Sequence, residues 1–278
     1  MLVTNAWNTV VRRAAPSPVV QWLDAREVRD AMDGPFACDK IRDAMPDAMW
    51  CAQQEIYGIQ VRVWTPSAAI RAPAACTAAC KEAARIVSWM IVLHAGVPPP
   101  ELTAIDIVLM PHRKSMKAAS IASLGPCHMN SGFTNGRHIV IYRKQQWQKV
   151  LIHEMIHALG IDLPLVDHYR ITPGCKWYEA WVEALACWLW SHVPCGRACD
   201  EQAPPGGHAC DEHLPDAPMV PGDAACVGHA TNTIAYTYGK RALLDDHARL
   251  LRKHLALRPA IGFKGDPDAM VRACLKRI

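Results

Sequence analysis

Alternating apolar and polar positions predict β-strands in the first half of the chain. Residues 56–65 (IYGIQVRVWT) alternate and are rich in β-branched and aromatic side chains, which favour strands. Residues 104–110 (AIDIVLM) and 138–143 (HIVIYR) are two further strand candidates. The stretch 124–135 between them contains Gly, Ser and Asn, which are typical of turns and loops. The pattern therefore predicts a small sheet.

Longer apolar stretches predict helices. Residues 77–95 are rich in Ala, contain no Gly or Pro, and are followed by Gly96, a typical helix stop. A second helix is expected over 145–159, where Gly160 follows, and a third over 178–191. This order of helices and strands is typical of an α+β domain.

The local composition divides the chain into four parts. Residues 1–55 are expected to form an N-terminal extension, much of it loosely ordered, because prolines interrupt its helix-like patches. Residues 56–192 form the core, and residues 193–230 form an irregular insertion rich in Cys, His and Pro. Residues 231–278 return to helix-compatible sequence and are expected to complete the same domain.

The overall composition is that of an ordinary globular protein, with 278 residues, 51% hydrophobic residues and a formal net charge of +4. No apolar run reaches the roughly 18 to 20 residues that a membrane span needs. The N-terminus lacks the charged leader of a secretory signal, so we expect an intracellular, cytoplasmic protein without a membrane partner. The weak positive charge does not favour a nucleic-acid partner, and the sequence does not indicate an oligomeric state.

The chain contains twelve cysteines. Because no secretory signal is recognised, a reducing compartment is expected, which favours free thiols or metal ligands over disulfides. Most of these cysteines are expected to be buried as small apolar residues.

The strongest functional signal is the pattern H-E-x-x-H, formed by His153, Glu154 and His157 in the sequence VLIHEMIHALG. On a helix, residues four apart project from one face, so both imidazoles can reach one ion while Glu154 lies beside the water bound there. This arrangement is typical of a hydrolytic zinc site. The neighbouring residues are apolar, so the helix is expected to be buried, and a metal would offset the cost of burying its polar side chains. The alternative is a pair of core histidines that are hydrogen-bonded to other groups.

A catalytic zinc needs a third protein ligand, and two glutamates are candidates. The metzincin pattern would place a histidine six residues after His157, where this chain has Leu163. Glu179 and Glu183 instead lie one turn apart in the apolar segment YEAWVEALACWLW. One of them could complete the zinc site while the other orients a ligand imidazole. A salt-bridged surface is the alternative interpretation of this pair.

HEMIH followed by EAWVE resembles the gluzincin branch of the zincin metallopeptidases, in which a downstream glutamate joins the two histidines. The pattern is similar to that of lethal-factor-like enzymes, which implies Glu179 as the third ligand and Glu183 as the orienting carboxylate, with the reverse assignment left open. Residues 105–189 also resemble uncharacterised zincin-like proteins of large DNA viruses. The resemblance implies a zincin-like α+β fold with a small mixed sheet packed on the active-site helix.

The same resemblance implies a zinc metallopeptidase that hydrolyses peptide bonds in a peptide or protein substrate. Zinc would lower the pKa of a water to about 7 and polarise the scissile carbonyl, and Glu154 would act as the general base. In zincins an edge strand pairs with the substrate backbone. By order this strand is 128–134, with main-chain groups of Asn130, Ser131 and Gly132. A plain loop is the alternative for this segment.

The insertion contains a second candidate metal site, a structural zinc. Its four candidate ligands are Cys195, Cys199, Cys210 and His213, although their spacing matches no standard zinc finger. Disulfides and unliganded thiols are the alternatives for these residues. Two other functions stay open: a catalytically inactive binding or structural protein on a zincin scaffold, for example in a virion, and a zinc-stabilised module that binds nucleic acid or another partner.

Overall fold

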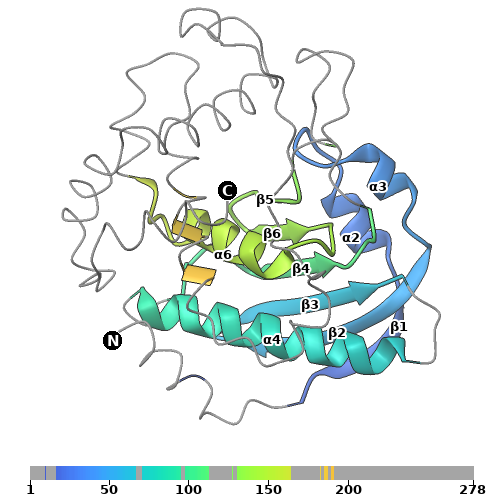
Figure 1. Ribbon diagram of the computed structural model, residues 1–278, viewed down its shortest axis with the longest axis horizontal. Coiled ribbons are helices and arrows are strands. Elements are labelled where there is room, and N and C mark those ends of the chain that lie inside the picture. Colours follow the sequence, from blue (N-terminus) through green and yellow to red (C-terminus); the bar gives the residue numbers. More distant parts are fainter. Residues whose placement is uncertain are drawn as a thin grey trace, which may run out of the picture.

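A mixed sheet with helices on both faces forms the part of the chain that the computed structural model describes (Figure 1). The residues described are 10, 17–66, 71–94, 98–112, 127, 130–163, 182, 185, 186, 189 and 190. The elements are, in chain order, β1 (Val19–Asp24), α2 (Arg26–Ala31), α3 (Asp39–Asp43), β2 (Ala48–Ile56), β3 (Ile59–Thr65), α4 (Ala72–Leu93), β4 (Ala104–Val108), β5 (Gly132–Thr134), β6 (His138–Ile141) and α6 (Trp147–Ala158). The predicted mixture of α-helices and a small mixed sheet is confirmed.

The six strands follow the order β1-β2-β3-β4-β6-β5. β1, β2 and β3 pair antiparallel, β3, β4 and β6 pair parallel, and β5 is antiparallel to β6. Parallel neighbours need a crossover connection, and α4 lies in the connection from β3 to β4 (Figure 1). Among the described strands, β5 lies at one edge of this sheet, the position expected for the edge strand.

Most predicted elements are present with small shifts of their ends. The strands expected over 104–110 and 138–143 are β4 and β6, and the helices expected over 77–95 and 145–159 are α4 and α6. α4 begins earlier than expected because Pro73 lies in its first turn, where a proline is tolerated.

The single strand expected over 56–65 is wrong, because this stretch is the end of β2, a tight turn and β3. Ile56 pairs with Ile59, and the two residues between them, Tyr57 and Gly58, have φ of 52° and 79°. A two-residue hairpin with two positive φ values is a type I′ turn, which matches the twist of the flanking strands.

The expectation of a loosely ordered N-terminal extension is also wrong for residues 19–55. These residues form β1, α2, α3 and β2, and the boundary expected at residue 55 falls inside β2. The prolines do not disrupt these elements because they lie between them: Pro18 precedes β1, Pro35 separates α2 from α3, and Pro46 separates α3 from β2. The helix-like patch over 21–32 is divided between β1 and α2.

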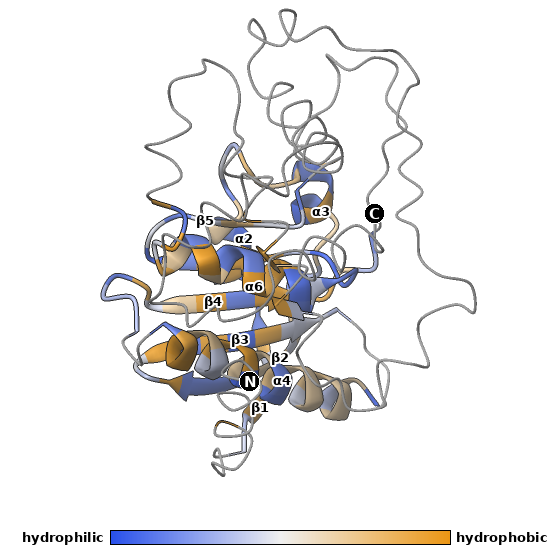
Figure 2. Ribbon diagram, turned by 60° about the vertical axis from the view of Figure 1, so that its left-hand side comes forward, coloured by the Kyte–Doolittle hydropathy of each residue, from blue (hydrophilic) through white to orange (hydrophobic). Residues whose placement is uncertain are grey.

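Two hydrophobic cores lie on opposite faces of the sheet. α4 and α6 cover one face, where their side chains pack against Val61, Ile105 and Ile139. α2 and α3 cover the other face, where they pack against Met49, Trp64 and Val140. Both α4 and α6 show hydrophobic and polar segments in Figure 2, as expected for helices with one buried side. The helix predicted over 178–191 is helical at its described positions, and Val182, Leu185, Ala186 and Leu189 are buried in the same core as α4 and α6.

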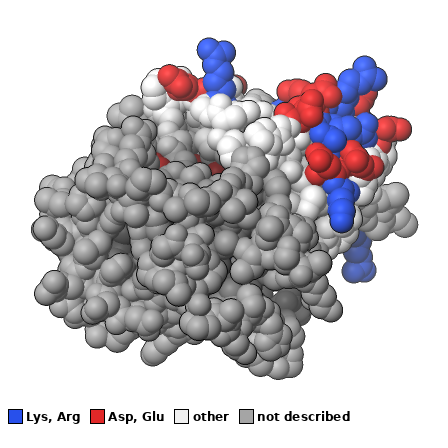
Figure 3. Space-filling view, turned by 90° about the horizontal axis from the view of Figure 1, so that it is seen from above, with Lys and Arg blue, Asp and Glu red and all other residues white. Residues whose placement is uncertain are grey.

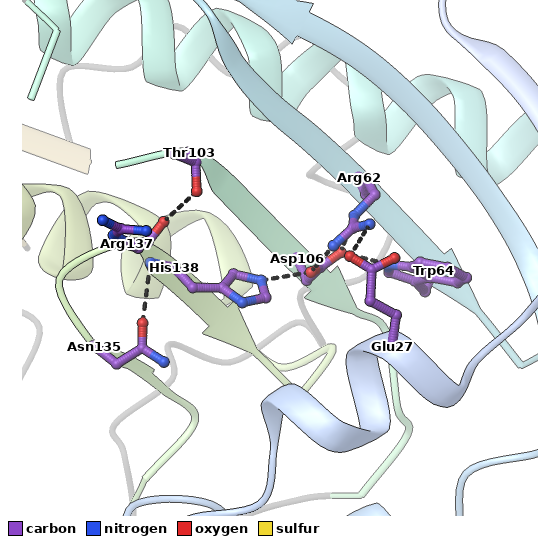
Figure 4. Close-up of polar contacts among 8 residues, drawn as sticks. All are labelled: Glu27, Arg62, Trp64, Thr103, Asp106, Asn135, Arg137 and His138. Carbon is purple, nitrogen blue, oxygen red and sulfur yellow. Dashed lines mark hydrogen bonds and ion pairs between the residues drawn. The ribbon is translucent and has the colours of Figure 1, made fainter. Parts of the chain in front are cut away.

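A buried ionic network joins the central strands on the α2 side (Figure 4). The carboxylate of Asp106 on β4 accepts hydrogen bonds from Nε and Nη2 of Arg62 at 2.7 and 2.6 Å and from Nε1 of Trp64 at 2.6 Å, and its Oδ2 lies 2.5 Å from Nε2 of His138. Arg62 also donates to Glu27 on α2. Burial opposes ionisation of Asp106, but the hydrogen bonds from His138 and Arg62 and the charge of Arg62 outweigh it and lower the pKa of this carboxyl.

The cysteines differ in part from the expectation of free thiols or metal ligands. Cys38 and Cys127 form a disulfide with a Cα–Cα distance of 4.4 Å, although 89 residues separate them in the sequence. Cys51, Cys76 and Cys80 are free and buried, as expected of small apolar residues. Structural disulfides are typical of oxidising compartments. This bond therefore does not favour the intracellular location, which stays a prediction.

Acidic and basic side chains are intermixed on the described face shown in Figure 3. Among the described residues, Arg42 forms ion pairs with Asp33, Asp39 and Asp43. Mixed charge of this kind is typical of a solvated surface. Among the helices that the structure describes, none is long and apolar enough to cross a bilayer.

Candidate metal centre

The H-E-x-x-H pattern lies on α6, a helix that is buried along most of its length. Leu151, Ile152, Met155 and Ile156 are fully enclosed in the core that α6 shares with α4 and the sheet. These four residues recur at spacings of one, three and four, so one broad side of the helix is apolar. The burial expected from the sequence is confirmed. Packing in this core holds α6, and with it His153, Glu154 and His157, in position.

The two histidine side chains converge. Nε2 of His153 and Nε2 of His157 lie 3.2 Å apart, and the ring planes are inclined at 66°. Two nitrogens that each lie 2.0 to 2.1 Å from one tetrahedral zinc ion would be about 3.3 to 3.4 Å apart. The observed separation therefore fits two ligands of a single small cation, and the predicted convergence of the two imidazoles is present.

Glu154, which follows His153 in the sequence, is buried, with 7% of its surface exposed. Its Oε2 accepts a hydrogen bond of 2.8 Å from Oγ1 of Thr134, which lies on β5. The same hydroxyl oxygen lies 3.3 Å from the main-chain carbonyl oxygen of Glu154. A carboxylate in this position is oriented by a neighbouring strand rather than left to rotate freely.

The end of α6 places a second carboxylate against His157. Gly160 adopts φ of +64°, and the N–H groups of Gly160 and Ile161 donate to the carbonyls of His157 and Ile156. This pair of bonds is a Schellman turn, which reverses the chain at the glycine that follows the helix. Asp162, two residues further on and 5% exposed, lies with Oδ2 2.7 Å from Nδ1 of His157.

The contact between Asp162 and His157 has a chemical consequence. In a neutral imidazole that donates from Nδ1, the other ring nitrogen keeps its lone pair. Nε2 of His157 is then the acceptor that a metal requires, and a carboxylate at Nδ1 raises its basicity. Sequence reasoning missed Asp162. The signal that could have found it is an acidic residue two positions after the glycine that ends the helix with the H-E-x-x-H pattern.

β5 runs alongside the face of α6 that carries Val150 and Glu154. An added Cβ at Gly132 would lie 2.9 Å from the carbonyl oxygen of Val140 and 3.0 Å from Cγ1 of Val150, so the absence of a side chain allows the strand to approach the helix. Two residues further along β5, Thr134 contacts Glu154, one turn beyond Val150. Two strand residues span about 6.6 Å and four helical residues about 6 Å. The two contacts are therefore spaced almost equally along β5 and along α6.

The hydrogen bonds between β5 and β6 determine which peptide groups of β5 point away from the sheet. The N–H of Tyr142 donates to the carbonyl of Ser131, and the N–H of Asn135 donates to the carbonyl of His138. Because paired residues alternate in an antiparallel ladder, the N–H and C=O groups of Gly132 and Thr134 face away from β6.

The three residues predicted for substrate-backbone binding therefore differ in their surroundings. The main-chain groups of Gly132 face the edge of β5 that no described strand pairs with, which we call the open edge. The carbonyl of Ser131 is bonded to β6, and the carbonyl of Asn130 accepts from Nε of Arg143. The Asn130 side chain donates to the carbonyl of Phe36. Thr134, which the prediction did not include, joins Gly132 at the open edge.

Arg143 and the disulfide fasten the chain that leads into β5. The Arg143 side chain, 1% exposed, donates to the carbonyls of Asn130, His112 and Cys127. Cys127 is also bonded to Cys38, which directly precedes α3. The start of β5 is thus connected both to the end of β6 and to the α3 side of the sheet.

Several predicted site residues lie outside the described residues. These are Glu179 and Glu183 and the candidate structural site in the insertion, Cys195, Cys199, Cys210 and His213. Within the described ranges, no group of three or more His, Cys, Asp or Glu side chains could hold a metal ion. A catalytic zinc needs three protein ligands, and the described residues bring together two candidates, His153 and His157.

No known protein family, curated protein or solved structure matches this chain.

Proposed function

We propose that this protein is a zinc-dependent metallopeptidase on a zincin-like fold. The observation that carries the proposal is the separation of 3.2 Å between the Nε2 atoms of His153 and His157, on a helix that also carries the buried Glu154. Two imidazoles in this position are suited to a cation such as zinc, and the glutamate between them is suited to proton transfer.

A metal accounts for features that a pair of core histidines does not. The two Nε2 atoms point at one another at the surface of a helix whose other side is apolar, and Asp162 keeps the lone pair of His157 on the converging nitrogen. Two neutral imidazoles could share one hydrogen bond there, but a divalent cation would satisfy both nitrogens at once. This arrangement of carboxylate, histidine and cation is common around zinc.

Glu179 is the proposed third ligand, supplied by the helix predicted over 178–191. The described positions of that helix support this assignment because Val182, Leu185, Ala186 and Leu189 pack into the core that contains α6. A helix that shares a core with α6 can deliver a side chain to the same site. Glu183 is proposed as the orienting carboxylate, in addition to Asp162.

The proposed reaction is hydrolysis of a peptide bond. Zinc, when bound, polarises the scissile carbonyl and lowers the pKa of the attacking water. Glu154 takes the proton from that water and passes it to the nitrogen of the leaving amine. The open edge of β5 binds the substrate as an extended strand, through the main-chain groups of Gly132 and Thr134.

The change Glu154→Gln tests the proposal. We expect this variant to bind zinc like the wild type and to lose hydrolysis, because an amide cannot accept the proton. The assay uses a mixture of quenched fluorescent peptides with and without 1,10-phenanthroline, and Glu55→Gln on exposed β2 surface is the matched control.

Two outcomes would contradict the proposal in different ways. Cleavage by Glu154→Gln at the wild-type rate would refute the role of the base. A wild-type protein that binds zinc through α6 but cleaves no peptide would instead support the inactive binding or structural protein on the same scaffold.

A further inference from the structure

We propose that Thr134 is a positioning residue that couples substrate binding on β5 to the general base on α6. The inference rests on the proposed peptidase function and concerns how Glu154 is aligned. Thr134 touches the two parts of the site at once, because its main-chain groups face the open edge of β5 while its side chain contacts Glu154.

The hydroxyl contact is suited to orienting a base. Oγ1 of Thr134 lies 2.8 Å from Oε2 of Glu154, and a hydroxyl has a single proton to donate. A hydrogen bond to a carboxylate is shorter and stronger than one between neutral groups. It engages one of the two carboxylate oxygens and fixes the plane of the group, so the second oxygen keeps a defined direction towards a water.

The strand geometry makes this contact sensitive to the substrate. Thr134 directs its N–H and C=O away from β6, so a peptide added to the edge would bond to Thr134 itself. The contact between Gly132 and Val150 and the contact between Thr134 and Glu154 are one helical turn apart and keep β5 in a fixed register along α6. Thr134 alone would therefore set the position of a bound peptide relative to Glu154.

The change Thr134→Val removes the hydroxyl and keeps the β-branched shape that suits a strand. We expect kcat to fall by about 10- to 100-fold, the usual effect of losing a group that orients a functional side chain. KM should change less than threefold because the main-chain groups of β5 remain. Zinc content should equal that of the wild type.

Two further variants separate positioning from general stability. Thr134→Ser restores a hydroxyl and should recover most of the lost kcat. Thr103→Val is the matched control, because the Thr103 hydroxyl also donates to a main-chain carbonyl, that of Arg137, in an exposed contact that does not involve Glu154 (Figure 4). This control should keep the wild-type kcat.

The outcomes distinguish this inference from the proposed function. An active wild type together with a Thr134→Val variant of unchanged kcat, or a Thr134→Ser variant as impaired as Thr134→Val, would overturn the role of Thr134 alone. A wild type that hydrolyses no peptide would overturn the proposed function and the catalytic role of Thr134 with it.

Discussion

Removal of the Asp162 carboxylate is expected to weaken zinc binding without altering the fold. Oδ2 of Asp162 lies 2.7 Å from Nδ1 of His157, while Oδ1 is buried and has no hydrogen-bond partner in the described part of the chain. The change Asp162→Ala therefore deletes one polar interaction, and that interaction is with a proposed zinc ligand.

The size of the effect follows from this contact. Loss of a partner that orients a metal-binding histidine usually reduces metal affinity by about 10- to 100-fold, which corresponds to about 1.4 to 2.7 kcal/mol. A single hydrogen bond to a charged group contributes about 1.5 to 3 kcal/mol, so the two figures agree. Asp162→Asn keeps an oxygen acceptor but loses the charge, and its affinity should lie between those of the wild type and Asp162→Ala.

The assay is a competition titration in which a fluorescent chelator of known affinity removes zinc from each variant. The unfolding midpoint of each metal-free protein, measured in parallel, shows whether the fold is preserved. If Asp162→Ala and the wild type bind zinc with the same Kd, Asp162 does not orient a zinc ligand, and the interpretation of this contact is wrong.

The remaining predictions concern the stability of the fold. Asp106→Asn should lower the free energy of unfolding by about 3 to 5 kcal/mol in urea, because it removes the buried counter-charge of Arg62 and leaves only the exposed carboxylate of Glu27 as its ion-pair partner. The folded-state pKa of Asp106 is lowered, so the stabilisation by its carboxylate is complete above the unfolded pKa of about 3.9 and is lost as the pH falls below that value. The free energy of unfolding of Asp106→Asn should therefore lack this loss at acid pH. Identical pH profiles of stability for the wild type and Asp106→Asn would contradict the network. Reduction of the Cys38–Cys127 bond, or replacement of both cysteines by Ser, should lower the unfolding free energy by about 4 to 5 kcal/mol, because the bond links residues 89 apart. Equal stability with and without reductant would show that the two thiols are not bonded in solution.

The sequence predicts the parts of the fold in which local pattern and tertiary packing agree. β4, β6, α4 and α6 each combine an apolar pattern with clear flanking signals, such as the glycine after α6, and each is found close to its expected bounds. The N-terminal elements are different, because β1 is an exposed edge strand and α2 and α3 are only six and five residues long. Their structure depends on pairing with β2 and on burial against Trp64, which no local pattern reveals.

The same reasoning applies to the candidate site. His153, Glu154 and His157 are close in sequence on one helix, so their geometry follows from the helical repeat. Thr134 and Asp162 reach the site through a strand and a turn, and their contacts depend on the register of β5 and on the left-handed Gly160. The pairing of Cys38 with Cys127 likewise needs the three-dimensional fold, because spacing does not fix disulfide connectivity.

Zinc analysis of the purified full-length protein and of its His153→Ala variant tests the central claim most directly. Convergence of two imidazoles on one cation predicts that the wild type contains about one zinc equivalent per chain more than His153→Ala after identical purification. Equal zinc content in the two proteins, with His153→Ala folded as judged by its unfolding midpoint, would contradict a metal centre on α6.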